Sequence, residues 1–439
     1  MTPFDASPRR SRQVGWSEFV SASMRRICHC VLVAQFLSGG LSLVAGAQTH
    51  FRRGVNIHHA LNWAALVGSP DQRYVFPPFA DRSHDLAVAD LRAIRSAGFD
   101  FVRMTVDPGP FLQFQGAQRD SAEGILLNRV QIVLDVGLAV IVDIHPNNQT
   151  AEYKAAALAD GVDGKRFSAY VSMLARIAAR LRPLDRSRVA LEIMNEPPVR
   201  GGSEADAAWE RMLIRAYAAI RQRAPNLTLI VSGAQAGSAA GLMGLNPRPF
   251  VADPAVLFTF HYYEPYTFTH QSTDQVDAFR WLRNVPYPAS ERSIHGAMTA
   301  LAASASASPV PIARRDEILT QSRAMLNQYA KSNFNHRTIE AAFDSLTAWA
   351  ARYRLAPSRV LLGEFGVMRT YGHYQGAENA DRVRWLSDVR IAAESHRIPW
   401  AVWVYKGYGG MAIVTADDSS EIDPLTARAL GLNAPTRPN

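Results

Sequence analysis

The sequence is poor in cysteine and lysine. Cys28 and Cys30 are its two cysteines, and both lie within the first 47 of the 439 residues. Without that segment the chain has no thiol for a disulfide, a thiolate nucleophile or a cysteine-ligated metal. Only four of the 47 basic residues are Lys, and the Arg residues are scattered rather than clustered. Such a distribution does not form a nucleic-acid-binding surface, so we expect no nucleic-acid partner.

After residue 47 the sequence also lacks an apolar run long enough to span a bilayer. Phosphate-binding P-loop, His-Glu-x-x-His and Gly-x-Ser-x-Gly motifs are absent as well. We therefore expect no metal and no cofactor. Hydrophobic residues make up 48% of the chain and charged residues 20%, which is ordinary for a soluble globular protein with a sizeable core. We expect a monomer.

The first 47 residues resemble an export signal. Arg25 and Arg26 precede an apolar stretch over residues 27–45, and Ala45-Gly46-Ala47 is a small-x-small cleavage motif. We expect cleavage after Ala47 and a secreted or periplasmic product, residues 48–439. An N-terminal membrane anchor is the alternative, but polar and glycine residues interrupt the run and leave it short for a spanning helix. Met1 and Met24 are both candidate starts.

The leader contributes to the net charge. It carries five Arg and two acidic residues, so the formal charge of +8 falls to 42 − 37, or about +5, in residues 48–439. This charge is modest for a chain of that size and indicates solubility rather than an anionic partner.

Short β-rich runs alternate with longer runs of helical periodicity, as in a parallel sheet built from βα units. The predicted strands are Arg53–Ile57, Asp100–Thr105, Ala139–Ile144, Arg188–Met194, Leu227–Ser232, Val256–Phe260, Arg359–Gly363 and Trp400–Val404. The predicted helices are Leu86–Ala97, Leu126–Val136, Tyr170–Leu181, Ala207–Arg221, Ile339–Tyr353 and Asp381–Ser395. Eight strands favour a single-domain α/β fold, a closed (β/α)8 TIM barrel over residues 48–439. An open doubly wound sheet is the alternative.

Two segments interrupt the alternation. Residues 62–83 follow the first strand, and residues 264–335 follow the sixth and have room for one or two extra helices. Both insertions follow a strand's C-terminal end, where barrel enzymes build their active sites.

Two glutamates occupy equivalent places. Glu196, in Met194-Asn195-Glu196-Pro197, follows the fourth predicted strand, and Glu364 follows the seventh. Strand ends meet at one rim of a barrel, so the two carboxyl groups can converge on one bond. Hydrolysis of a glycoside needs such a pair: one acid protonates the leaving oxygen, and the other attacks the anomeric carbon or activates water. Either glutamate alone could equally be a solvated loop acid.

Further polar and aromatic residues are predicted at the same rim. Arg103 ends the second strand, His145 the third and His261 the sixth, while Trp403 lies in the eighth. Each has a structural alternative: Arg103 as a core salt bridge to Glu192, His145 as a satisfied buried histidine and Trp403 as barrel packing. Their recurrence at successive strand ends favours an active site.

Taken together, these residues resemble glycoside hydrolase family 5, the cellulase-type barrels. The resemblance covers roughly residues 51–410 and depends on Arg53-Gly54-Val55-Asn56, Arg103, His145, Asn195-Glu196-Pro197, His261-x-Tyr263, Glu364-Phe365-Gly366 and Trp403. It implies a retaining double displacement with Glu196 as acid/base and Glu364 as nucleophile. Glu196 must then keep its proton near neutral pH, which a less polar setting and the charge of Glu364 favour.

The resemblance also implies roles for the remaining site residues. Arg103 and Tyr263 would hold Glu364, and Asn195 would bind the sugar 2-hydroxyl. His145 and His261 would contact sugar hydroxyls or orient the acid/base. Trp403 would lie under the sugar at the cleavage point. In the insertions, Trp63, Tyr74, Tyr266 and Trp281 are candidates for further aromatic rings that stack on sugar units.

The substrate implied first is β-1,4-glucan, with endo cleavage. The sequence departs from the family pattern at Pro198 and at Pro146-Asn147, where a second histidine is common. β-Mannan, mixed-linkage glucan, β-1,3-glucan and a bacterial exopolysaccharide therefore stay open. From another class, the chain could be a non-catalytic carbohydrate-binding barrel, which would have no physical reason to keep Glu196 and Glu364 together. Endo or exo action depends on the shape of the two insertions.

Overall fold

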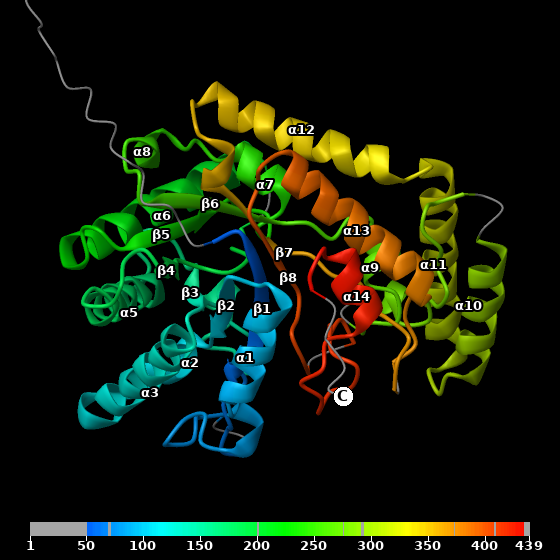
Figure 1. Ribbon diagram of the computed structural model, residues 1–439. Helices are drawn as coiled ribbons and strands as arrows, with labels where there is room; N and C mark the ends of the chain where they lie inside the picture. The colour runs from blue at the N-terminus through cyan, green and yellow to red at the C-terminus, as the bar shows by residue number, and fades with distance from the viewer. Residues whose placement is uncertain are drawn as a thin grey trace, which may run out of the picture. The chain divides into compact units, whose positions relative to one another are not determined.

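Eight parallel strands form a closed barrel in which each strand pairs with the next along the chain and β8 returns to β1. The computed structural model describes residues 51–433 except 69–71, 200–201, 275, 291–293, 373 and 408–409. Within the compact unit Gly46–Asn439 the strands are surrounded by helices (Figure 1). The predicted (β/α)8 barrel is confirmed, and the open sheet is excluded.

The predicted export signal, residues 1–47, lies outside the described residues. Among the helices of the described ranges, none combines the length and apolar character needed to cross a bilayer.

The strand predictions agree with the structure except at strand ends. The strands are β1 Arg53–Leu61, β2 Phe101–Val106, β3 Ala139–Ile144, β4 Val189–Glu192, β5 Thr228–Ser232, β6 Val256–His261, β7 Val360–Glu364 and β8 Trp400–Val402. β1 is four residues longer than predicted, whereas β4 and β8 are two residues shorter at their C-terminal ends. Glu196 and Trp403 therefore lie in the loops that follow their strands, and Arg103 lies inside β2 rather than at its end.

All six predicted helices are present with shifted ends. The α-helices are α1 Val88–Ala97, α2 Pro108–Gln113, α3 Gly116–Asp135, α4 Ala155–Leu158, α5 Lys165–Leu181, α6 Ser203–Arg223, α7 Ala239–Gly244, α8 Arg248–Val251, α9 Tyr266–Thr269, α10 His295–Ala307, α11 Ile312–Ser332, α12 His336–Arg352, α13 Asn379–Ser395 and α14 Pro424–Ala429. Short 3-10 helices are η1 Arg82–His84, η2 Asp277–Phe279 and η3 Pro357–Arg359.

Helix α12 illustrates how the sequence sets these elements. Asn335 caps its N-terminus: its side chain accepts from the backbone N–H of Arg337, and a capping box with Thr338 satisfies a further free donor. Buried apolar residues then recur at helical spacing and fix the helix to the outside of the barrel; these are Ile339, Phe343, Leu346 and Ala350.

The insertion after β6 carries the extra helices that its length predicted. It holds α9, α10 and α11, and the last two lie side by side at the right of Figure 1. The insertion after β1 has no long helix in its described part; it contains the antiparallel bridge between Leu66 and Tyr74 and the turn η1.

Candidate active site

The interior of the barrel changes from apolar to polar along the strands. Its lower layer is a buried cluster, separate from the core beneath the helices; it contains Phe51, Phe101, Ala139, Ile141, Ala190, Ile230, Leu257, Leu361 and Ala401. Side chains two residues apart share one face of a strand. The next inward positions on five strands are therefore Arg103, Asp143, Glu192, Thr259 and Gly363. Polar side chains begin one layer below the rim.

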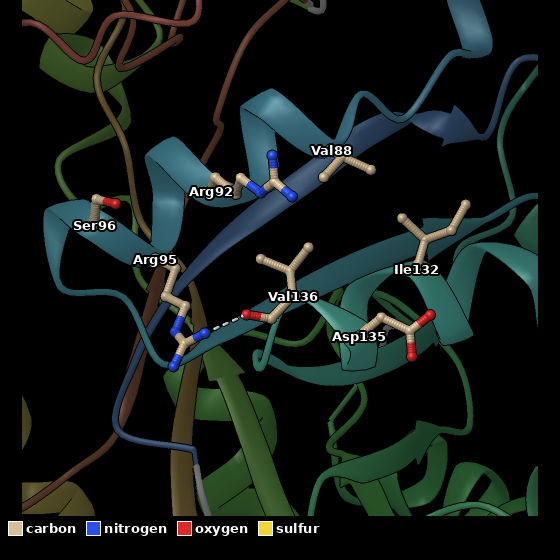
Figure 2. A pocket seen from close by; sticks show the side chains of 7 residues that line it. All are labelled: Val88, Arg92, Arg95, Ser96, Ile132, Asp135 and Val136. Carbon is tan, nitrogen blue, oxygen red and sulfur yellow. Dashed lines mark hydrogen bonds between the residues drawn. The ribbon is translucent and has the colours of Figure 1, made fainter.

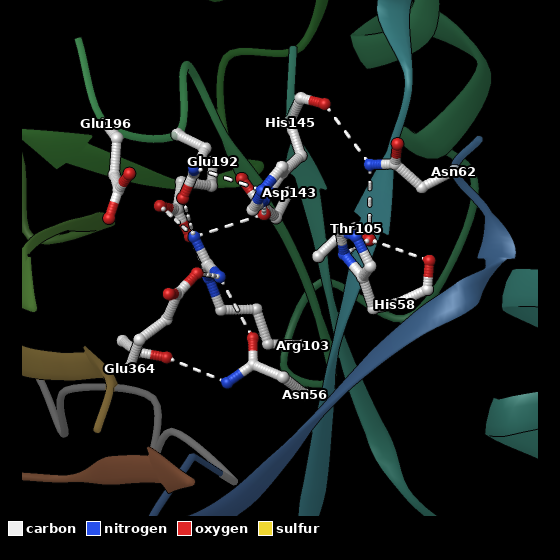
Figure 3. Close-up of polar contacts among 12 residues, drawn as sticks. Asn56, His58, Asn62, Arg103, Thr105, Asp143, His145, Glu192, Glu196 and Glu364 are labelled. Atoms are coloured by element: carbon white, nitrogen blue, oxygen red, sulfur yellow. Dashed lines mark hydrogen bonds and ion pairs between the residues drawn. The ribbon is translucent and has the colours of Figure 1, made fainter. Parts of the chain in front are cut away.

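Arg103 is the centre of this polar layer and is completely buried. Its Nε and Nη2 atoms donate to the two oxygens of Glu192, at 2.8 Å each, and Nη1 donates to Glu364 Oε1 at 2.6 Å. Nη2 also lies 3.1 Å from Asp143 Oδ2. Figure 3 shows Glu192 and Glu364 turned toward the guanidinium. Arg103 therefore forms the core ion pair with Glu192 and also contacts Glu364.

The charged side chains in this layer change one another's pKa values. Burial opposes the charged form of Arg103, but Asp143, Glu192 and Glu364 outweigh it and raise the pKa of the guanidinium well above its ordinary value. Burial raises the pKa of Asp143 to about 7, although Arg103 acts in the opposite direction. Burial likewise raises the pKa of Glu192. One cation therefore stabilises a cluster in which acidic groups outnumber it.

A bulge in β7 turns Glu364 into the barrel. Phe260 pairs with Leu362 but His261 pairs with Glu364, so Gly363 is an extra residue on β7. If side chains alternated without interruption from Leu361, Gly363 would face the barrel interior and Glu364 would face outward. The bulge instead turns the Glu364 carboxylate into the interior. A β-carbon on Gly363 would lie 2.6 Å from Thr259 Oγ1 and 3.1 Å from His261 Nε2. Only glycine leaves room for these side chains.

Glu364 is held on both sides. Its side chain is 5% exposed. Besides the Arg103 contact at Oε1, the Tyr263 hydroxyl donates to Oε2 at 2.9 Å. Burial and the neighbouring Glu364 raise the pKa of Tyr263 well above its ordinary value, so the phenol keeps its proton and donates. Asn56 supports the backbone next to Glu364, since its Nδ2 donates to the carbonyl oxygens of Gly363 in β7 and Val402 in β8.

Glu196 occupies a more open environment. Its side chain is 40% exposed, and Oε1 lies 2.9 Å from His261 Nδ1. Burial lowers the pKa of His261 to about 4, so this imidazole is neutral at neutral pH. An oxygen of Glu196, an oxygen of Glu364 and a ring nitrogen of His261 all lie within 4.8 Å of one another. The two glutamates predicted to converge do meet.

The backbone at Glu196 adopts an uncommon conformation. Its φ of +43° lies in the left-handed region that residues with a β-carbon rarely adopt. Hydrogen bonds on either side hold it: the Asn195 N–H donates to Ile144 O at 2.8 Å, and the Ala236 N–H donates to Pro197 O at 3.0 Å. The short loop after β4 is thus fixed by β3 and by the segment after β5, and it directs the Glu196 side chain toward His261.

A hydrogen-bonded chain links the third and fourth strands. Asp143 Oδ2 lies 2.7 Å from His145 Nδ1, and His145 Nε2 lies 3.2 Å from Asn195 Nδ2. The other end of the Asn195 amide, Oδ1, accepts from Arg103 Nη2 at 2.8 Å. Burial lowers the pKa of His145 to about 4. The chain therefore closes back on Arg103 through an uncharged histidine.

Aromatic rings form one wall of the site. The Trp403 ring stacks on His145, with centroids 5.8 Å apart and planes at 18°, and meets His58 at 4.9 Å. His58 also joins Trp63, whose indole N–H donates to His58 Nε2 at 2.8 Å. The predicted positions of Trp403 and His145 in one site are thus correct, and both residues pack against each other.

Two of the four further platforms are wrong. Tyr74 and Trp281 are 3% and 4% exposed, and the Tyr74 hydroxyl donates to Asp107 inside the insertion after β1. These aromatics are packing residues, because the apolar rings of long insertions fill the space beneath them. Trp63 and Tyr266 are 36% and 44% exposed and stay candidates.

Sequence reasoning missed Asp143 as part of the site, and it named Asn56 only within the motif Arg53-Gly54-Val55-Asn56. Asp143 carried a usable signal, since it stands two residues before His145 and must share its face of β3. Asn56 and His58 carry the same signal on β1, as the next positions after Gly54 on one strand face.

A separate groove of about 620 Å³ lies between helices α1 and α3 (Figure 2). Arg95 crosses it and donates to Val136 O at 2.6 Å. None of the residues predicted for the active site lines this groove, so it is not the site formed by the strand ends.

Comparisons with known proteins agree with this arrangement. The family model "Cellulase (glycosyl hydrolase family 5)" matches residues 81–409. Endoglucanase 3 of Fibrobacter succinogenes is 21% identical over 82% of this chain, which spans half of that protein. Endoglucanase C of Acetivibrio thermocellus is 22% identical, over 72% of this chain and 83% of its own.

A solved structure, endoglucanase Cel5A of Thermotoga maritima, has the same fold. It superposes with a TM-score of 0.61 at 21% identity and covers 88% of this chain and 98% of its own. The family match extends over most of the barrel, including the polar layer and both glutamates. The chain therefore belongs to glycosyl hydrolase family 5 and is an O-glycosyl hydrolase.

Proposed function

We propose that the protein is a retaining endo-β-1,4-glucanase in which Glu364 is the nucleophile and Glu196 the general acid/base. The observation that carries this proposal is the separation of the two side chains, with one oxygen of each within 4.8 Å of the other. Retaining glycosidases hold their carboxyl groups about 5–5.5 Å apart, whereas inverting enzymes leave roughly 6.5–9.5 Å for a water molecule. The spacing favours direct attack by a carboxylate.

The environments of the two acids support different roles. Glu364 is buried, and the Arg103 guanidinium and the Tyr263 hydroxyl each donate to one of its oxygens, contacts that hold the carboxyl group in place as a nucleophile. Glu196 is partly exposed beside a neutral His261. The neutral imidazole brings no positive charge to Glu196, which the proposal assigns to proton transfer.

In the proposed first step, Glu364 attacks the anomeric carbon while Glu196 gives its proton to the glycosidic oxygen, whose bond to that carbon breaks. The products are a glycosyl ester on Glu364 and a released sugar. In the second step, ionised Glu196 takes a proton from water, and the hydroxide attacks the same carbon and frees Glu364. Two inversions give net retention.

Other residues bind the sugar in this proposal. The Asn195 amide contacts the 2-hydroxyl, an interaction that strengthens as the oxocarbenium-like transition state forms. Trp403 offers its ring to the apolar face of a pyranose, and its stacking on His145 fixes the ring's orientation. His145 and His261 present ring nitrogens toward the same region. Trp63 and Tyr266, both partly exposed, extend the surface beyond the cleavage point.

β-1,4-Glucan is the first substrate to test because the relatives are endoglucanases. The Thermotoga protein has been solved with cellobiose and with mannotriose, so β-mannan belongs in the same panel. The panel compares carboxymethylcellulose, barley β-glucan, mannan, laminarin and xylan by reducing-sugar release. A fall in carboxymethylcellulose viscosity that precedes most sugar release indicates endo cleavage.

Variants test the two roles separately. Glu364→Gln and Glu196→Gln should abolish polymer hydrolysis, while Glu317→Gln, an exposed glutamate on α11, serves as the matched control. With a dinitrophenyl glycoside and azide, Glu196→Ala should yield the β-glycosyl azide and Glu364→Ala the α-glycosyl azide. Exchanged products would reverse the assignment. A wild type inactive on every polymer, or variants that stay active, would favour a carbohydrate-binding barrel or another exopolysaccharide.

We also propose that the enzyme is exported after cleavage behind Ala47, which puts it where polymers occur. Expression of the full chain in a bacterium, followed by N-terminal sequencing of the protein outside the cytoplasm, tests this. A sequence beginning at Gln48 supports it, and retention of Arg25 and Arg26 in a membrane fraction supports an anchor.

A further inference from the structure

Asp143 is a buried acid that the proposed double displacement does not use. It lies one layer below the rim on β3, with no exposed surface. Its Oδ2 atom contacts both His145 Nδ1, at 2.7 Å, and Arg103 Nη2, at 3.1 Å. Its Oδ1 atom has no hydrogen-bond partner among the described residues. Burial of a half-satisfied carboxyl group costs stability, so packing does not explain the residue.

We propose that Asp143 is a positioning residue that sets the tautomer of His145 and, through it, the orientation of the Asn195 amide toward the sugar 2-hydroxyl. The inference rests on the proposed function, since it assigns a task within that reaction. It concerns a residue that touches neither the substrate nor Glu364.

The first step is the tautomer of His145. A carboxylate can only accept hydrogen bonds, so its contact with Nδ1 requires the proton on Nδ1. Burial raises the pKa of Asp143 to about 7 and the Arg103 cation opposes that rise, so the carboxylate predominates above about pH 7. A neutral imidazole carries one proton, and His145 is neutral because burial lowers its pKa to about 4. Its Nε2 atom is therefore a bare acceptor.

The second step is the orientation of Asn195. The atom that faces His145 Nε2 at 3.2 Å must be a donor, so the amide nitrogen points there and the amide oxygen points to Arg103. An amide nitrogen has two hydrogens. One binds His145, and the second is available to the sugar. If the proton moved to Nε2, two donors would face each other and this hydrogen bond would be lost, so the amide would keep only one of its two anchors, the Arg103 contact at Oδ1.

Figure 3 shows Asp143 and His145 beside the Arg103 guanidinium. Glu192 offers a natural control because it is a second buried carboxylate on the same arginine. The structure gives Glu192 no hydrogen bond to His145 or Asn195 among the described contacts. Replacing either acid with its amide removes one charge from Arg103, but only Asp143→Asn alters the partner of His145.

The decisive experiment compares two substrates. One is 2,4-dinitrophenyl β-cellobioside, or the glycone that the polymer panel selects, and the other lacks the 2-hydroxyl on the sugar next to the leaving group. This leaving group departs without a proton, so Glu196 does not limit the comparison. Asp143→Asn should lower kcat/KM on the complete substrate by about 10-fold, the loss expected when one well-placed hydrogen bond to the substrate is weakened. The loss on the 2-deoxy substrate should be much smaller.

Two variants calibrate the result. Asn195→Ala should show the same substrate-dependent loss, because it removes the amide itself. Glu192→Gln should affect both substrates by the same factor. Equal losses for Asp143→Asn on the two substrates would overturn the inference while leaving the proposed function intact. A wild type that hydrolyses neither glycoside would instead count against the proposed function.

A measurement without substrate tests the first step directly. In protein labelled with 15N-histidine, the two ring nitrogens report which of them carries the proton, and His145→Gln identifies the signal. The wild type should show protonated Nδ1, and Asp143→Asn should lose that preference. A wild-type His145 protonated on Nε2 would overturn the proposal. The urea midpoint of Asp143→Asn should fall no more than that of Glu192→Gln, because each variant removes one carboxylate from buried Arg103; a much larger fall would indicate a structural role.

Discussion

Replacing Arg103 with methionine should destabilise the protein by about 3–5 kcal/mol, the usual effect of removing one partner from a buried ion pair. Methionine occupies a similar volume and adapts to irregular space, so little of the loss comes from a cavity. The loss arises because Asp143, Glu192 and Glu364 stay buried without their cation. A domain of this kind is stable by about 5–15 kcal/mol, so the variant should fold with a clearly lower urea midpoint.

The partner variant makes the prediction specific. Glu192→Gln leaves Arg103 with two carboxylates, so its effect should be smaller, and the double variant should lose less than the sum of the two. Contacting residues typically couple by about 0.5–3 kcal/mol. Equilibrium urea unfolding, followed by fluorescence of the eight tryptophans, measures all four free energies at about pH 7.

The pH dependence of the stability loss in Arg103→Met tests whether buried charge causes that loss. Burial already raises the pKa of Asp143 to about 7 and that of Glu192 above its usual range. Without Arg103 these values rise further, and a carboxyl whose pKa is raised by folding loses stability as the pH increases. The part of the Arg103→Met deficit that comes from Asp143 should therefore grow as the pH rises above about 7, where this carboxyl is charged in the folded wild type but still protonated in the folded variant, and it should shrink as the pH falls toward 7. A variant within about 1 kcal/mol of wild type, or a deficit that does not change with pH, would show that Arg103 does not compensate buried charge.

Three further predictions concern single sites. Tyr263→Phe removes a hydrogen bond to the Glu364 carboxyl group, worth about 1.5–3 kcal/mol, so kcat/KM should fall about 10- to 100-fold. The control is Tyr262→Phe, whose ring packs on Phe343 outside the barrel, and it should leave kcat/KM unchanged. Gly363→Ala forces a methyl group to 2.6 Å from Thr259 Oγ1 and should cost about 1–3 kcal/mol in urea unfolding; an unchanged midpoint would contradict the close approach. Burial alone lowers the pKa of His270 from 6.5 to about 4, so the wild type should lose stability as the pH falls through that interval. By about pH 5 this loss amounts to about 2 kcal/mol, and His270→Gln should lack it.

Much of the fold followed from local patterns. Short β-rich runs marked the strands and apolar residues at helical spacing marked the helices, because both signals depend on residues close in the chain. Strand ends were less accurate, as at β4 and β8, where tertiary pairing decides how far a ladder continues. The insertions were the least predictable, since an aromatic ring such as Tyr74 looks the same in sequence whether it faces solvent or fills a loop.

The sequence by itself determined the barrel and the two glutamates that meet at its rim. Only the tertiary structure decided how they meet. The bulge at Gly363 turns Glu364 inward, and Arg103 reaches Glu364 across 261 residues of chain. The pairing of Asp143 with His145 was within reach of local periodicity, but its link to Asn195 needs strands β3 and β4 in register. Periodicity fixes which face of a strand a side chain occupies, whereas contact depends on register and closure, which no single segment encodes.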